Sequence, residues 1–233
     1  MALTPESNQA FIREVDDEVR RERLTQFWTR WGRVAIVVLV LALAAFGGWL
    51  YWQHRQTEAA GRQGEQLQAA FDQLGSGQAK QAQPALAELA GSSRDGYRAL
   101  AKFTQADILL QNNDLRGAAA RFAEVANDEG LAKPFRDLAL IRQTAAEFDA
   151  LRPQVVIQRM RPLAAPGSPW LGSAGEMMAV AHIRLGQNRE AGALFGRIAR
   201  DENTPPSLRQ RAVQMAGVLG VDAVAPNEET RAR

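Results

Sequence analysis

The longest apolar run in the chain extends from Val34 to Gln53 and contains no charged residue. Twenty helical residues rise about 30 Å, which is the thickness of the hydrocarbon core of a bilayer. A buried helix of a soluble protein would keep a polar stripe, and this run has none. Aromatic rings that favour the headgroup regions stand near both ends, with Trp31 before the run and Trp49 and Trp52 in its last turns. The pattern predicts a transmembrane helix over residues 34–53.

A cleaved export signal is the alternative interpretation of the same run. The triplet Ala42-Leu43-Ala44 resembles a small-residue cleavage site. However, the n-region of a signal is short and basic, whereas the 33 residues before this run are polar and include acids such as Glu14 and Asp16. The triplet also lies in the middle of the run, so the pattern favours a retained anchor.

The basic residues beside the run predict its orientation. Five arginines precede it closely and two follow within a similar distance: Arg20, Arg21, Arg23, Arg30 and Arg33 before it, and Arg55 and Arg62 after it. Cytoplasmic flanks carry the excess of Lys and Arg. Residues 1–33 are therefore expected to form a cytoplasmic arm, and the residues after the helix are expected to be exported.

After the run, helix formers predominate and one pattern recurs four times. A small or β-branched residue is followed by large apolar residues four and seven positions later and by Ala eight positions later; the four starting residues are Ala82, Ala118, Val156 and Ala191. This spacing keeps the residues on one face of a helix. Twelve positions before each start stands another small residue, namely Ala70, Ala106, Thr144 and Ala179.

Turn residues separate the two helices of each unit. Gly77, Asn113 and Gly186 occupy one matching position, and both residue types tolerate the left-handed conformation that ends a helix. The third unit has Leu151 there, with Pro153 placed to begin the next helix. Each unit is thus a helix, a turn and a helix, with offsets of 36, 38 and 35 residues. This resembles the tetratricopeptide repeat, whose period is near 34.

The predicted fold is all-α, with a single transmembrane helix followed by an α-solenoid of degenerate tetratricopeptide-like repeats over residues 54–221. The units lack the repeat's usual Trp, Gly and Pro, and Ala-rich helices that match by chance are the alternative. A last helix, 207–219, is ended by Gly220 and is expected to cover the end of the solenoid. The polar residues 222–233 are expected to form a disordered tail.

Composition excludes several chemistries. The 233 residues contain no Cys, so disulfides and thiolate sites are absent, and the net charge of +2 without a long basic block argues against nucleic-acid binding. The two histidines, His54 and His182, are expected to be structural. No motif indicates a catalytic, cofactor-binding or metal-binding residue, or a small-molecule substrate. The chain is predicted not to be an enzyme.

Three segments carry a resemblance to a known family: IREVDDEVRRERLTQFWTRWGR, GGWLYWQ and PPSLRQRAVQMAGVLG. With the overall layout, they resemble the ancillary SecYEG translocon subunit family of the YfgM type. The resemblance implies a protein of the inner membrane, with a periplasmic tetratricopeptide-like domain that associates with the export channel and with periplasmic chaperones. A related repeat domain occurs in a cell-division coordinator, so a cell-division or envelope regulator is the alternative.

In tetratricopeptide arrays the first helix of each unit lines the concave surface, which is where solenoids bind partners. The repeat phase places eight apolar residues toward that side: Leu67, Phe71, Leu100, Phe103, Leu110, Leu138, Ile141 and Phe148. A large exposed apolar patch marks an interaction site. Either a partner segment occupies this groove, or the last helix folds back to fill it. Phe122 and Phe195, on the second helices, are expected to be buried.

Overall fold

The computed structural model describes the backbone of residues 5–223, and the side chains of residues 30, 32–34 and 36–223. Within these residues the chain forms helices and no strand, which confirms the predicted fold class. The helices are α1 (Pro5–Gly75), α2 (Ala79–Ala90), α3 (Asp95–Gln111), α4 (Leu115–Ala126), α5 (Lys133–Ala146), α6 (Pro153–Met160), α7 (Leu171–Arg184), α8 (Asn188–Arg200) and α9 (Pro206–Val218). The predicted disordered tail lies outside the described residues except for Asp222 and Ala223.

The chain separates into two compact units, Met1–Arg62 and Gln63–Arg233. The first unit contains the apolar run, which lies within α1. Its large apolar side chains from Val34 to Trp52 are 45 to 63% exposed, so the run is not a core helix of this chain. Within the described residues, α1 is the one helix that is long and apolar enough to span a membrane.

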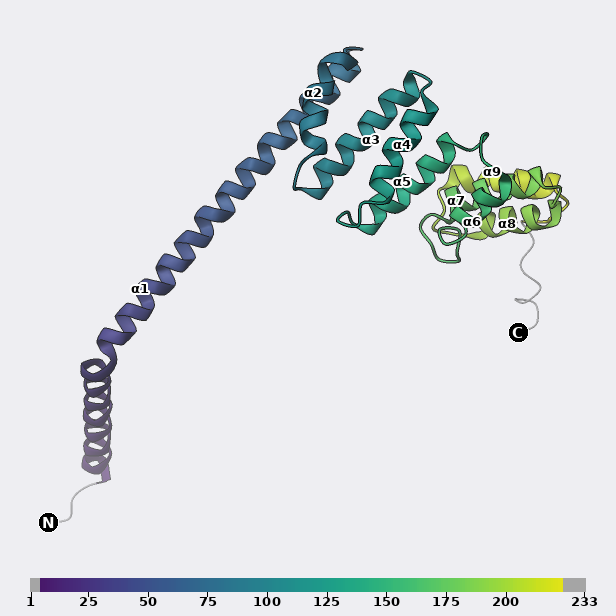
Figure 1. Cartoon of the computed structure of the whole chain (residues 1–233). Coiled ribbons are helices and arrows are strands. Elements are labelled where there is room, and N and C mark those ends of the chain that lie inside the picture. Colours follow the sequence, from purple (N-terminus) through teal and green to yellow (C-terminus); the bar gives the residue numbers. More distant parts are fainter. Residues whose placement is uncertain (1–4, 224–233) are drawn as a thin grey trace. The chain divides into compact units, whose positions relative to one another are not determined.

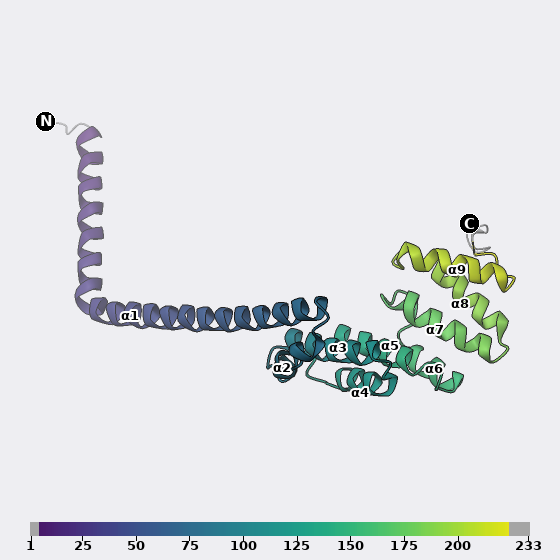
Figure 2. The ribbon, with the colours of Figure 1, turned by 90° about the horizontal axis from the view of Figure 1, so that it is seen from above.

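In the second unit, successive helices lie side by side along the array (Figures 1 and 2). The last turns of α1 and helix α2 form repeat one, α3 and α4 form repeat two, α5 and α6 form repeat three, and α7 and α8 form repeat four. The small residues predicted on the first helices are fully buried, with Ala70, Ala106, Thr144 and Ala179 all 0% exposed. Each therefore marks a close approach between neighbouring helices.

The second helices supply the large core side chains. Phe122 is 0% exposed and Phe195 is 1% exposed, which confirms that both are buried. The Phe122 ring lies 6.0 Å from the ring of Phe103, at a tilted angle that suits aromatic pairs. The repeat phase inferred from the sequence is thus the phase of the folded array.

The turns inside the repeats have the predicted chemistry. Gly77, Asn113 and Gly186 have φ angles of 74°, 59° and 73°, in the left-handed region that Gly and Asn tolerate. In repeat three the boundary is marked instead by Pro153, in the first turn of α6, where its fixed φ suits a helix start.

The second helix of repeat three is shorter than the pattern predicted. The pattern runs to Ala164, but α6 ends at Met160. Pro162 explains the early end, because its nitrogen carries no hydrogen to continue the helical ladder. Leu163 and Ala164 are still buried, at 4% exposure each, because the chain turns them against the core after the helix has ended.

Helix α9 confirms the predicted terminal helix, and Gly220 follows it with a φ of 78°. Among the described helices, α9 packs against α8 and α7 and against no earlier one. It buries Ala212 and Ala216 there, while Val218 is 80% exposed. The last helix therefore closes the end of the array and does not fold back along α3 and α5.

Candidate protein-binding surface

The eight predicted surface residues fall into three groups by exposure. Leu67, Phe103 and Ile141 are buried, at 6 to 7% exposure, and belong to the three hydrophobic cores. Leu110, Leu138 and Phe148 are half-buried and pack against those cores. Phe71 and Leu100 are exposed, at 39% and 42%. The predicted set is thus not one open groove, because its buried members already have neighbours within the chain.

Phe148 lines a cavity. A cavity of about 390 Å³ lies between the end of α5 and helix α7, the first helices of repeats three and four. Apolar side chains form most of it, and two carboxylates stand among them; the lining residues are Ala145, Phe148, Asp149, Glu176, Met177 and Val180. An apolar cavity with a few polar groups suits an apolar side chain of a partner beside a basic one.

Arg184 of α7 holds Phe148 in place. Its Nη1 donates a hydrogen bond of 3.0 Å to the Phe148 carbonyl oxygen, and its guanidinium carbon lies 5.5 Å from the centre of the Phe148 ring. A cation over an aromatic face is attracted by the negative face of the ring. Together these contacts fix the end of α5 against α7 and orient the ring that lines the cavity.

The two carboxylates at the cavity differ in their partners. Glu176 is paired with Arg211 of α9, and this hydrogen bond and charge raise the pKa of the Arg211 guanidinium. Arginine is protonated at every accessible pH, so this shift gives no pH dependence in a practical range. Asp149 forms no ion pair or side-chain hydrogen bond within the described chain, which leaves its charge available to a cationic group.

A second cavity, of about 440 Å³, lies on the other side of the end of α5. It is lined from α4 by Leu115, which is 47% exposed, and by Arg116. The rest of its wall is the last turn of α5 and the turn that follows, including Ala145, Asp149 and Leu151. Because Ala145 and Asp149 line both cavities, the end of α5 is accessible from two sides.

The residues of α7 in the first cavity were not predicted from the sequence. Carrying the repeat phase from Leu138, Ile141 and Phe148 into repeat four gives Ser173, Glu176 and Ile183. A search for apolar residues at these positions passes over Glu176, which does line the cavity. Met177 lies one residue after Glu176, and Val180 lies four residues after it, so neither stands at a position carried over from the prediction; the cavity lining identifies them.

Both histidine side chains contact a polar side chain nearby in the sequence. His182 lies at the end of α7, with its Nδ1 2.7 Å from Oε1 of Gln187 in the following turn. His54 lies 3.1 Å from the carboxylate of Glu58, one helical turn away, and both side chains are more than half exposed. Both contacts are local ones within a helix or at its end.

Comparison with known proteins gives one match. The sequence profile of the tetratricopeptide repeat-like domain matches residues 25–153, which is more than half of the chain. The matched segment begins before the apolar run and ends at the first residue of α6, so it includes both the membrane-capable helix and the first repeats. No curated protein and no solved structure matched the chain. The length of the profile match shows that the chain belongs to the tetratricopeptide repeat-like family.

Proposed function

We propose that this protein is a single-pass inner-membrane scaffold whose periplasmic array binds proteins at the export translocon and periplasmic chaperones. Arrays of this family act in protein–protein interaction and are typically not catalytic. The apolar run of α1 supports an anchor, and the arginine excess before it supports a cytoplasmic N-terminus. The likeness of the arm, the span and the terminal helix to the YfgM-type family supports the choice of partner.

The observation that carries the proposal is the cavity at Phe148. It joins the first helices of two adjacent repeats, which is the face where solenoids bind partners. Its apolar lining is accessible, whereas Phe103 and Ile141 are enclosed in the cores. Binding at this cavity would bury Met177 and Val180, each half-buried in the chain alone, and would give Asp149 a cationic neighbour.

Photo-crosslinking in intact cells tests this function. A benzophenone amino acid replaces Met177 in one variant and Val180 in another, and the crosslinked proteins are identified by mass spectrometry. The matched control carries the probe at Gln154, which is exposed on α6. Export-channel subunits or periplasmic chaperones are expected from the cavity positions and not from Gln154. Recovery of division proteins without any export component would favour the cell-division regulator.

A substitution pair tests the role of the cavity directly. Met177→Gln with Val180→Thr makes the lining polar at nearly constant volume, so the array should fold while the crosslinks are lost. The crosslinks are then captured through a probe at Ala145, which also lines the cavity. Crosslinks that persist at full yield in the folded double variant would show that partners do not bind there.

A further inference from the structure

Helix α8 presents a stripe of arginines on its exposed face. The stripe begins at Arg189 and continues with Ala193, Arg197 and Arg200, which are four, eight and eleven residues further along the helix. These spacings place the four residues on one side of the helix. All four are exposed, while the opposite side of α8 buries Phe195 and its neighbours. The stripe extends over about 16 Å along the helix at 1.5 Å per residue.

The repeats show that Arg197 departs from the pattern of the array. The equivalent positions in repeats one and two are Glu88 and Glu124. Each contacts a residue 22 positions earlier, on the first helix of its own repeat: Glu88 accepts a hydrogen bond of 3.2 Å from Gln66, and Glu124 pairs with Lys102 at 3.5 Å. In repeat four the carboxylate is replaced by a guanidinium.

No described residue of the array compensates for this change. The residue 22 positions before Arg197 is Gly175, which has no side chain to reach it. Arg189, Arg197 and Arg200 form no ion pair or side-chain hydrogen bond within the described part of the chain. The stripe therefore holds positive charge that the fold itself does not use.

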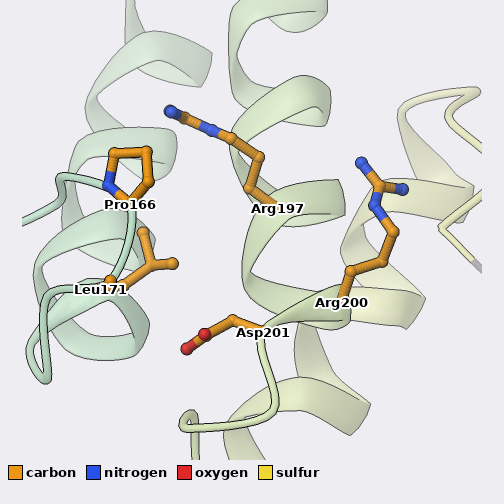
Figure 3. A pocket seen from close by; sticks show the side chains of 6 residues that line it. Pro166, Leu171, Arg197, Arg200 and Asp201 are labelled. Carbon is orange, nitrogen blue, oxygen red and sulfur yellow. The ribbon is translucent and has the colours of Figure 1, made fainter. Parts of the chain in front are cut away.

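A pocket lies against the stripe. Its volume is about 240 Å³, and Figure 3 shows Pro166 and Leu171 on one side with Arg197, Arg200 and Asp201 on the other. The Asp201 Oδ2 accepts a hydrogen bond of 2.6 Å from the Thr204 hydroxyl, so this carboxylate already has a partner. The Arg197 side chain extends toward Pro166, whereas the Arg200 side chain points away from the pocket, so the positive charge of the stripe lies at the rim of the pocket beside an apolar wall.

We propose that this stripe and its pocket bind an acidic segment of a protein partner, at a surface separate from the Phe148 cavity. The inference rests on the proposed function, since it assumes that the array binds proteins. Guanidinium groups bind carboxylates in a planar two-point geometry, which favours Asp and Glu side chains. Three arginines in helical register are fewer than the four to eight basic residues of a segment that adsorbs to anionic lipid, so a peptide is favoured over a membrane surface.

Peptide binding to the full chain tests the proposal. The protein is held in phosphatidylcholine nanodiscs, and fluorescence anisotropy measures binding of a labelled peptide of five Glu-Ala repeats. Arg197→Gln with Arg200→Gln should raise its Kd by about tenfold or more, because two charge-assisted contacts are lost. Lys80→Gln with Arg116→Gln is the matched control: it removes the same charge from the positions equivalent to Arg189 in repeats one and two.

Further arms separate the outcomes. A peptide of Gln-Ala repeats should not bind. The variant Arg197→Lys with Arg200→Lys keeps the charge and loses the planar geometry, so its Kd for the Glu-Ala peptide should lie between that of the wild type and that of the Gln pair. An equal loss of peptide affinity in the Arg197/Arg200 Gln pair and in its control would overturn the proposal. Attachment of the protein to phosphatidylglycerol vesicles without any peptide binding would also overturn it. Met177→Gln with Val180→Thr should leave peptide binding unchanged, so failure of the cavity function and failure of the stripe are distinguishable.

Discussion

The Arg142 side chain reaches from α5 to two other helices, with its guanidinium on the Asp107 carboxylate of α3 and over the Phe122 ring of α4. Nη1 donates to Asp107 Oδ2 at 3.2 Å, Nη2 donates to the other carboxylate oxygen, and the guanidinium carbon lies 4.9 Å from the ring centre. One residue thus ties repeat two to repeat three above the buried aromatic pair.

A double-mutant cycle on Asp107 and Arg142 measures this link. Both side chains are more than a third exposed, at 39% and 36%, so solvent screens the pair. The two-point geometry is favourable, and a coupling of about 0.5–1 kcal/mol is expected in chemical denaturation at low salt, with less at 1 M salt. A coupling within error of zero at low salt would show that the pair is not formed in solution.

The buried Phe122 and the exposed Phe71 form a second residue-scale test. Phe122→Ala removes a fully buried ring and is expected to lower the free energy of unfolding by about 3–5 kcal/mol. Phe71→Ala, at a site 39% exposed, is the control and should cost far less. Thermal melts followed by circular dichroism compare the two, and similar losses would contradict the assigned repeat phase.

The sequence did not predict which residues of the candidate site are buried. Helical spacing shows which residues share a face, but a first helix inside the array has neighbours on both sides. Phe103 and Ile141 share the face of exposed Leu100 and half-buried Leu138, yet they are enclosed by α4 and by the core of repeats three and four. Phe103→Glu would therefore test the core and not a groove.

At the scale of the element, α8 has glycines where it contacts the segment that follows α9. A Cβ built at Gly192 would lie 2.7 Å from the Val221 side chain, and one at Gly196 would lie 3.5 Å from it. After α9 the chain thus returns to α8, and Val221 packs at Gly192, where a residue with a side chain would leave no room. Ala223, at 7% exposure, belongs to the same hydrophobic core as Phe195 of α8.

Gly192→Ala is expected to destabilise the array by about 1–3 kcal/mol, because the added methyl group displaces Val221. Gly217→Ala is the control: it lies in α9 with nothing within 4 Å of the added Cβ, and alanine favours a helix by up to about 1 kcal/mol over glycine. Chemical denaturation should give opposite signs for the two variants. Loss of stability in both would contradict the packing of the terminal segment.

The elements themselves were largely predictable, because each boundary has a local cause. The small residues and the left-handed turn positions determine the repeat register, and Pro153 marks the start of α6. The early end of α6 was not predicted, although Pro162 was visible: the recurring apolar pattern was followed across it to Ala164. At Pro162 the loss of a backbone donor outweighs the period, whereas Pro84 is tolerated inside α2.

At the scale of the whole molecule, the orientation across the membrane can be tested directly. Protease added to spheroplasts is expected to digest the chain after His54 and to leave the arm and span protected, since the arginine excess lies before the apolar run. Immunoblotting with antibodies to each end measures this. Protection of the repeats would reverse the orientation, and a mature chain beginning near Ala45 would indicate a cleaved signal.

The two halves of the array carry opposite charge. Residues 63–150 contain twelve acidic and nine basic residues, whereas residues 151–223 contain nine arginines and five acidic residues. The unpaired Asp149 lies in the acidic half and the arginine stripe in the basic half. Two surfaces of opposite sign would let one array hold two kinds of partner at once, with the salt dependence of each set by its own charges.

Among the described helices of the array, α2 to α9, each packs only against the next one or the next but one along the chain. A helix therefore completes its contacts within the array once the next two helices have been made, and none of these contacts waits for a more distant segment. Such low contact order favours fast folding that proceeds in the order of synthesis. A chain threaded through a membrane channel from its anchored end would assemble one repeat after another as it emerges, with little exposed apolar surface for a chaperone to shield.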